Sequence, residues 1–214
     1  MSTKIKICGL TRPEDVEAVN KVLPDYVGFV FASESSRYCT NEQASILSAM
    51  LHSQIIPVGV FVNADINDII TLFDQSIIRM AQLHGRESDE YIRCLKIARP
   101  LLPIIRMIPG DTNLDNISCD SVDYFLFDSD RGGSGKTFDW SKIKKMERPF
   151  FLAGGIKLDN ALLALRLQPF AIDVSSGVET NGYKDAQKIK ELVSIIRNSE
   201  SICSQNETKR EVNK

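Results

Sequence analysis

The sequence predicts an α/β protein: a single (β/α)8 barrel domain, or TIM barrel, with lean loops. Eight short runs rich in β-branched and aromatic residues recur along the chain, and segments of helical periodicity separate them. Strands that alternate with helices build a parallel sheet, because parallel neighbours need a crossover connection. Eight such units close naturally into a barrel.

Expected strands and expected helices follow one another in order. The strands cover residues 4–8, 26–31, 56–62, 78–83, 103–107, 124–128, 150–153 and 171–174. The helices cover residues 13–22, 41–51, 66–73, 89–98, 158–167 and 185–198, with weaker helical patterns near 113–117 and 141–146. Thr11 ahead of Pro13, and Asp65 ahead of Ile66, are polar residues of the kind that begin helices.

The chain has 214 residues, which is short for this fold, since its members typically have about 250. Loops must therefore be lean, and one or two helices reduced. A doubly wound open sheet is the alternative, but it normally uses fewer strands and carries a dinucleotide fingerprint after the first, where this chain reads Cys8-Gly9. Residues 1–198 thus form one barrel domain, and the polar, aperiodic residues 199–214 form a tail that we expect to be frayed.

Composition excludes several kinds of partner. With 26 Lys plus Arg against 28 Asp plus Glu, the formal net charge is -2. The chain therefore lacks the excess positive charge expected of a protein that binds nucleic acid or an anionic membrane. A hydrophobic content of 43% fits a globular protein with one large core, and no stretch approaches transmembrane length. The expected partner is a small molecule, and the chain can be a monomer or a homodimer.

Cysteine and histidine usage bears on redox compartment and on metals. The five cysteines stand at positions 8, 39, 94, 119 and 203, an odd number with no Cys-x-x-Cys pair, which favours a reducing cytoplasm over a disulfide framework. The first residues contain too short an apolar run for a signal peptide, so we expect a cytoplasmic location. With only two histidines, His52 and His84, and no clustered cysteines, a metal site is not expected.

In a (β/α)8 barrel the active site lies on the face built by the loops that follow the strands. The loops after the seventh and eighth strands commonly hold phosphate through backbone N–H groups. Here they carry Gly154 and Gly155, and then Ser175 and Ser176. Either pair alone could simply allow the chain to turn. Both pairs together, at the ends of the seventh and eighth strands, predict a phosphorylated substrate.

Asp128 ends an apolar strand and leads into a glycine-rich loop at 132–140. Residues 135–137 match the end of a nucleotide-binding P-loop, but Asp130 stands where that motif needs its first glycine, which argues against an ATPase. Asp128 is therefore placed to act as a catalytic acid, or else to cap the loop that follows it.

Cys8 is the last residue of the first strand, so its side chain can point into the barrel mouth. A lone cysteine is often only a small buried hydrophobe. Its thiol becomes a usable base if a neighbouring cation or dipole favours the thiolate. Cys8 and Asp128 are thus candidates for the base and the acid of one reaction.

Several short motifs run along the chain. They are KICGLTRPED within residues 4–15, GFVF and SSRY within 28–38, VGVFVN at 58–63, QLHG at 82–85, GGSGKTFDW at 132–140, LAGGI at 152–156 and DVSSGVE at 173–179. Together, over nearly the full length to about Asn198, they resemble the phosphoribosylanthranilate isomerase family.

The resemblance implies a barrel enzyme of tryptophan biosynthesis that needs no cofactor. Its reaction is the Amadori rearrangement of N-(5-phosphoribosyl)anthranilate to 1-(2-carboxyphenylamino)-1-deoxyribulose 5-phosphate. By the same resemblance Asp128 is the general acid, Cys8 the general base, and Arg37 the group that meets the anthranilate carboxylate, which suits a planar guanidinium. The residues that match phosphate-loop positions are Gly154, Gly155, Ser175 and Ser176.

The chain departs from the family pattern at three places. Ser36 replaces the usual proline before Arg37, so the loop loses a fixed backbone angle and is expected to be more mobile. Arg86 stands where an acidic residue is usual, and residues 129–131 add an acidic and basic pair. His84 either contacts the ligand or braces the rim, and bracing is the simpler interpretation.

Two other functions fit parts of this pattern. A phosphosugar isomerase of histidine biosynthesis shares the barrel and the phosphate site, but such enzymes usually rely on an aspartate pair, which Cys8 argues against. A binding protein that keeps the phosphate loops without turnover is the other alternative, and the retained Cys8, Arg37 and Asp128 argue against it.

Overall fold

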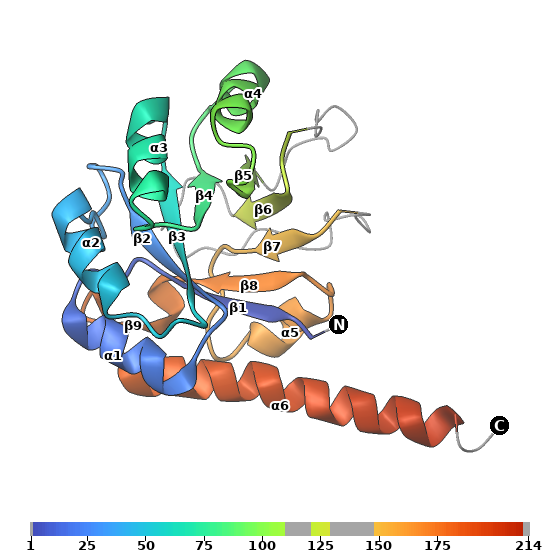
Figure 1. Cartoon of the computed structure of the whole chain (residues 1–214). Coiled ribbons are helices and arrows are strands. Elements are labelled where there is room, and N and C mark those ends of the chain that lie inside the picture. Colours follow the sequence, from blue (N-terminus) through green and yellow to red (C-terminus); the bar gives the residue numbers. More distant parts are fainter. Residues whose placement is uncertain (1, 110–120, 129–147, 212–214) are drawn as a thin grey trace.

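The computed structural model describes residues 2–109, 121–128 and 148–211, and it has the predicted barrel (Figure 1). Parallel strands pair in sequence order, and β8 closes the barrel on β1. The strands are β1 (Lys4–Cys8), β2 (Tyr26–Val30), β3 (Ile56–Phe61), β4 (Met80–Leu83), β5 (Ile104–Pro109), β6 (Tyr124–Asp128), β7 (Phe150–Leu152) and β8 (Ala171–Val174). The helices are α1 (Pro13–Val22), α2 (Asn41–Ala49), α3 (Ile66–Asp74), α4 (Asp89–Ala98), α5 (Ala161–Leu165) and α6 (Ala186–Glu211).

Every expected strand is present, and the ends differ from the expected ones by no more than two residues. The weak helical patterns near 113–117 and 141–146, and the glycine-rich loop at 132–140, lie outside the described residues. Helix α5 has only 5 residues, in keeping with a short chain. It starts late because Asn160 accepts a hydrogen bond from the Lys157 N–H at 2.8 Å, which holds the preceding residues in a turn.

One of the two predicted helix starts is correct. Asp65 begins α3, and its side chain accepts a hydrogen bond from the Asn67 N–H at 2.8 Å. The prediction for Thr11 is wrong, because α1 begins after Arg12. The buried Asp15 carboxylate accepts hydrogen bonds from the N–H groups of Thr11 and Arg12 at 3.0 and 3.1 Å, so a residue inside the first turn caps this helix.

Helix α6 continues past Asn198, where the sequence pattern predicted it to end. Residues 199–211 contain neither glycine nor proline, so none of them breaks an established helix. The helix end predicted at Asn198 is therefore wrong, whereas the frayed tail at 199–214 and the domain boundary at 198 stay predictions. The helix lies beside α1 and α5 (Figure 1). Its buried apolar residues within 186–199 are Ile189, Leu192, Val193 and Ile196.

Alternation along the strands divides the buried residues between two cores. Ile5, Ile7 and Phe29 belong to the larger cluster, which lies between the barrel and its helices. The alternate positions fill the barrel itself, where Tyr26 and Leu126 belong to an apolar cluster. No helix within the described ranges is both long and apolar enough to cross a membrane.

The barrel interior changes from apolar to polar along its axis. Met80 of β4 and Ala171 of β8 lie in the apolar cluster, and two residues further along the same strands come the buried polar side chains Gln82 and Asp173. Lys6 of β1 is also completely buried at this polar level. A polar layer therefore separates the apolar bottom of the barrel from its mouth.

A short hairpin follows β8 and was not predicted. Its strands are β9 (Glu179–Thr180) and β10 (Tyr183–Lys184). Asn181 and Gly182, which join them, have φ of 53 and 82°. A two-residue hairpin turn that matches the right-handed twist of its strands requires positive φ angles at both residues, and Asn-Gly is its favoured sequence. The hairpin brings Glu179 and Lys184 to the rim of the barrel.

Packing of the barrel bottom can be tested at Phe151. This side chain is fully buried, and its ring centroid lies 5.4, 5.5 and 5.6 Å from those of Tyr26, Tyr124 and Phe170. We expect Phe151→Ala to lower the free energy of unfolding by about 3–5 kcal/mol, because it removes a large ring and leaves a cavity. Urea denaturation measures this change.

The matched control is Leu162→Ala on α5, where the side chain is 55% exposed. We expect this control to change stability by no more than about 0.5 kcal/mol. A loss at Phe151 as small as that of the control would contradict its place in the barrel interior.

Candidate active site

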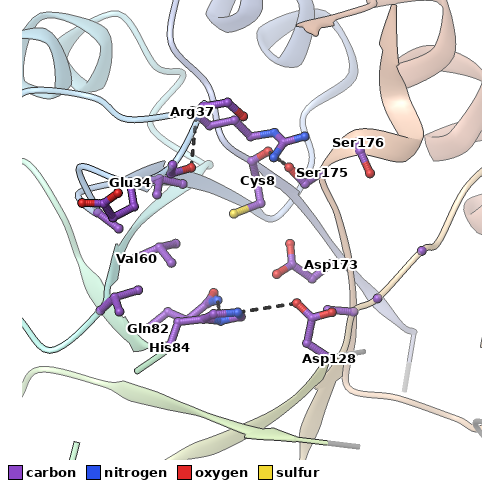
Figure 2. Close-up of a pocket in the computed structure, with 18 of the residues that line it drawn as sticks. Cys8, Glu34, Arg37, Val60, Gln82, His84, Asp128, Asp173, Ser175 and Ser176 are labelled. Atoms are coloured by element: carbon purple, nitrogen blue, oxygen red, sulfur yellow. Dashed lines mark hydrogen bonds and ion pairs between the residues drawn. The ribbon is translucent and has the colours of Figure 1, made fainter. Parts of the chain in front are cut away.

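A cavity of about 560 Å³ opens at the carboxyl ends of the strands. It lies where this fold places its active sites, and side chains from β1, β4, β6 and β8 face it (Figure 2). The structure brings all seven predicted site residues to its walls: Cys8, Arg37, Asp128, Gly154, Gly155, Ser175 and Ser176. Their proximity follows from barrel closure, because residues far apart in sequence end neighbouring strands.

Cys8 directs its thiol into the cavity, and Asp128 faces the same space from the opposite side (Figure 2). Gly28 on the neighbouring strand makes room for the thiol: a Cβ at this position would lie 2.6 Å from Cys8 Sγ. Burial raises the pKa of Cys8, and Lys6 lowers it by charge and by a hydrogen bond, with a net upward direction. The predicted neighbouring cation is thus present, but burial outweighs it.

Lys6 is that cation, and it lies at the floor of the site. Its Nζ donates hydrogen bonds to Asp173 Oδ2 and Gln82 Oε1, both at 2.8 Å. Burial lowers the pKa of Lys6, but Asp173 and Cys8 outweigh burial and leave it above its ordinary value, so the side chain is an ammonium. Among the described residues, Asp173 Oδ1 is buried without a hydrogen-bond partner. Because Asp173 also lines the cavity, this oxygen can accept a hydrogen bond from a substrate hydroxyl.

His84 lies between Gln82 and Asp128 (Figure 2). Its Nδ1 is 3.0 Å from Gln82 Nε2, and its Nε2 is 3.6 Å from Asp128 Oδ2. Burial and the charge of Lys6 lower the pKa of His84 to about 4, so the ring is neutral at neutral pH. His84 therefore lines the cavity between Gln82 and the predicted acid. Bracing of the rim and contact with the ligand both stay predictions.

The two predicted phosphate loops lie against each other. Gly154 and Gly155 have φ of 82 and 66°, a conformation that glycine adopts without strain. A Cβ on Gly177 would lie 1.9 Å from the Ile156 carbonyl oxygen, so the loop after β8 can approach the loop after β7 only with glycine here. Ser175 Oγ donates a hydrogen bond to the Cys8 carbonyl at 3.0 Å, which ties the same loop to β1.

Arg37 reaches the cavity from the loop after β2 and is held by the hairpin. Its Nε and Nη2 donate hydrogen bonds to the two carboxylate oxygens of Glu179 at 2.7 and 2.8 Å. Lys184 Nζ donates to the same carboxylate at 2.5 Å. Burial raises the pKa of Glu179, but the hydrogen bonds from Arg37 and Lys184 outweigh burial, so its pKa lies below the ordinary value.

This contact with Glu179 refines the predicted role of Arg37. Of the two edges by which a guanidinium binds a carboxylate with paired N–H groups, the Nε and Nη2 edge is occupied by Glu179. A ligand carboxylate would therefore meet the edge formed by Nη1 and Nη2. Gly9, with φ of 84°, lets the arginine pass, since a Cβ there would lie 2.4 Å from Arg37 Cδ.

The family departures have modest structural effects within the described residues. The loop that contains Ser36 is tied by hydrogen bonds from the Arg37 N–H to Ser35 Oγ at 3.1 Å and from the Tyr38 N–H to the Ser35 carbonyl at 3.0 Å. Its expected mobility stays a prediction. Arg86 is exposed and does not line the cavity. Residues 129–131 lie outside the described part of the chain.

Comparison with known proteins identifies the family. Residues 5–195 match the family described as N-(5'phosphoribosyl)anthranilate (PRA) isomerase. The chain belongs to this family. An N-(5'-phosphoribosyl)anthranilate isomerase of Endomicrobium trichonymphae is 45% identical over 203 residues, which cover 91% of this chain and 98% of that protein.

Solved structures agree with this result. A crystal structure of monomers of the dimeric phosphoribosylanthranilate isomerase of Thermotoga maritima has a TM-score of 0.78 and 33% identity, and the match covers 92% of this chain and 99% of that one. A second family structure, in complex with reduced 1-(O-carboxyphenylamino)-1-deoxyribulose 5-phosphate, has a TM-score of 0.74 and 29% identity, with 92% and 99% covered.

In this chain, the sequence analysis missed the polar side chains that support the predicted residues. These are Lys6, Gln82, Asp173, Glu179 and Lys184. A signal exists for Gln82 and Asp173, because each is the one polar residue of an otherwise apolar strand. Lys6 carries a weaker signal: it alternates with Cys8, which was expected to face the barrel mouth. Nothing in the sequence marks Glu179 as the partner of Arg37, since 142 residues separate them.

Within the described ranges, no three His, Cys, Asp or Glu side chains lie close enough to hold a metal ion. Of the cysteines in the described residues, Cys8 and Cys39 are buried thiols and Cys94 is an exposed one.

The space for the Cys8 thiol can be tested at Gly28. We expect Gly28→Ala to lower kcat at least about tenfold, because the added methyl group displaces Sγ and a displacement of about 1 Å costs catalytic efficiency. Gly59→Ala is the matched control: its Cβ would meet the Phe61 ring at 2.7 Å, away from the cavity. We expect it to lose a similar amount of stability while keeping its turnover.

The measurements are kcat from steady-state kinetics and the urea midpoint of each variant. Equal turnover in the two alanine variants would show that Gly28 does not shape the thiol position.

Proposed function

We propose that this cavity carries out the reaction of its family, the Amadori rearrangement of N-(5'-phosphoribosyl)anthranilate to 1-(2-carboxyphenylamino)-1-deoxyribulose 5-phosphate, with Asp128 as general acid and Cys8 as general base. The observation that carries the proposal is that these two groups face one cavity from opposite sides, next to both phosphate loops (Figure 2). Acid and base on opposite sides of a substrate can transfer two protons without a cofactor.

The substrate phosphate binds at the loops after β7 and β8. Gly154, Gly155, Ser175 and Ser176 supply backbone N–H groups there, and Ser176 adds a hydroxyl, because the Ser175 hydroxyl already donates to the Cys8 carbonyl. The close approach of the two loops concentrates these donors. The complex of a relative with a reduced phosphorylated product analogue supports a site of this kind. Phosphate at this end orients the sugar across the mouth between Cys8 and Asp128.

Asp128 starts the reaction. Its carboxyl group donates a proton to the ribose ring oxygen while the bond from that oxygen to C1 breaks and the anthranilate nitrogen forms a double bond to C1. The product of this step is an open-chain Schiff base with a cationic nitrogen. The step leaves a carboxylate on Asp128, which His84 faces at 3.6 Å.

Cys8 acts in the second step. Its thiolate takes the proton from C2, and the electron pair of that bond forms a C1–C2 double bond and neutralises the nitrogen, which gives an enolamine that tautomerises to the ketone. Burial opposes the thiolate, whereas Lys6 and Lys184 favour it. The cationic Schiff base adds a third positive charge beside the thiol, so a larger fraction of Cys8 is thiolate at the stage when C2 loses its proton.

Arg37 binds the anthranilate carboxylate through its Nη1 and Nη2 edge. The bond to Glu179 holds the guanidinium in place, so little side-chain entropy is lost on binding. A reduced Cys8 is required in this mechanism, which supports the reducing cytoplasm expected from the cysteine pattern. Since one structural relative is dimeric, a homodimer is proposed beside the monomer for this chain.

The acid and base roles are tested by Cys8→Ala and Asp128→Asn. We expect each to lower kcat by about 10² to 10⁴ while binding of inorganic phosphate is kept, because each removes one proton-transfer group. The decay of substrate fluorescence under saturating conditions measures kcat. Cys94→Ala, which changes an exposed cysteine of α4, is the control and should keep full turnover.

Near-normal turnover in either variant would remove that residue from the mechanism. If the wild-type protein binds a product analogue tightly without turnover, the isomerase proposal itself fails. Assay of the histidine-pathway aminoaldose substrate beside the anthranilate one tests for a second activity.

The role of Arg37 is tested by Arg37→Lys. We expect KM to rise about tenfold or more with a smaller change in kcat, because one ammonium cannot bind Glu179 and a ligand carboxylate with paired N–H groups. Arg86→Lys at the exposed rim is the control. A KM equal to that of the wild type would place the anthranilate carboxylate elsewhere.

A further inference from the structure

A line of polar groups runs from the barrel floor to Asp128. Lys6 Nζ contacts Gln82 Oε1 at 2.8 Å, Gln82 Nε2 contacts His84 Nδ1 at 3.0 Å, and His84 Nε2 faces Asp128 Oδ2 at 3.6 Å. The first two residues of the line are buried, and the last two line the cavity. Each link has a direction that follows from the chemistry of its donor.

The direction begins at Lys6, because an ammonium group can only donate hydrogen bonds. The Gln82 atom beside it must therefore be the carbonyl oxygen, and the amide NH2 must face His84. An amide NH2 also can only donate, so His84 Nδ1 must be an acceptor and carry no hydrogen. In a neutral ring the hydrogen then sits on Nε2, the nitrogen that faces Asp128.

Two observations agree with a neutral ring in this tautomer. Protonation of Nδ1 would set an N–H against the Gln82 NH2, which leaves two buried donors opposed. Burial and the charge of Lys6 also lower the pKa of His84 to about 4. The buried Lys6–Asp173 ion pair holds the first link in place, because it fixes the ammonium between β1 and β8.

We propose that Lys6 and Gln82 act as positioning residues: they hold His84 in its Nε2–H tautomer, so that this N–H donates to Asp128 Oδ2 and stabilises the carboxylate formed when the acid proton reaches the ring oxygen. The inference rests on the proposed acid role of Asp128. The 3.6 Å separation exceeds a normal hydrogen bond, and a side-chain shift of well under 1 Å would close it.

The stabilisation increases as the reaction proceeds. An N–H donor binds a carboxylate more strongly than a neutral carboxyl group, so the His84 contact gains strength while Asp128 loses its proton. An interaction that is stronger in the transition state than in the ground state raises kcat rather than lowering KM. His84 thus contributes without itself transferring a proton.

The tautomer can be observed directly. Two-bond ¹H–¹⁵N correlation spectra report which ring nitrogen carries hydrogen, and the chain has 2 histidines, so His52→Gln leaves His84 as the one histidine signal. His52 is exposed and does not line the cavity. In this background we expect a neutral ring with its hydrogen on Nε2 from about pH 8 to about pH 5. A hydrogen on Nδ1, or an imidazolium in this range, would overturn the proposal.

Two substitutions at Gln82 test the cause. Gln82→Met keeps the length of the side chain but removes the donor, and we expect a mixture of tautomers. Gln82→Glu still accepts from Lys6 but offers an acceptor to Nδ1, and we expect hydrogen on Nδ1. Both variants should lower kcat about ten- to a hundredfold with little change in KM. An Nε2–H tautomer and wild-type kcat in both variants would reduce Gln82 to a packing residue.

The same background separates this inference from the proposed acid role. Asp128→Asn removes the acid but not the Lys6 and Gln82 links, so the Nε2–H tautomer should persist while turnover is lost. If Asp128→Asn keeps its turnover, the acid role of Asp128 fails, and with it the role of His84 in stabilising the Asp128 carboxylate. The selection of the His84 tautomer by Lys6 and Gln82 would still stand or fall on the spectra. Loss of the Nε2–H tautomer in Asp128→Asn would mean that Asp128, and not Gln82, selects it.

Discussion

The buried ammonium of Lys6 is the constraint on which the active site depends. A charge at the centre of a barrel is tolerated only when its hydrogen bonds are satisfied and a counter-charge is near. Asp173 supplies the charge from β8 and Gln82 a carbonyl oxygen from β4, each at 2.8 Å. These requirements connect three strands across the barrel. They also set the electrostatics beneath Cys8, whose thiol lies at the same mouth.

Around this floor the rim is built from loops that hold one another. Arg37 and Lys184 share the Glu179 carboxylate, and this joins the loop after β2 to the hairpin after β8. Gly177 allows the two phosphate loops to touch. The groups that would meet a substrate are thus preorganised by contacts that are not themselves part of the reaction, which is how a site avoids reorganisation cost during catalysis.

Much of the fold could be predicted because it is local. Alternation of apolar residues marks each strand, and amphipathic spacing marks each helix, so the barrel and most element ends follow from neighbours in the chain. Two element ends were predicted wrongly although their causes are also local. Asp15 inside α1, rather than Thr11 before it, caps the helix, and α6 continues past Asn198 because no residue there stops it.

For the site, the sequence determined the positions that reach the barrel mouth: Cys8 and Asp128 at strand ends, Arg37 after β2, and the glycine and serine pairs after β7 and β8. Strand ends can be identified from local pattern, and a closed barrel brings them to one face. Only the tertiary structure decided which groups touch. The Lys6–Gln82–His84 line and the Arg37–Glu179 pair join residues 76 and 142 positions apart, and such contacts depend on barrel closure and side-chain direction, which no local pattern encodes.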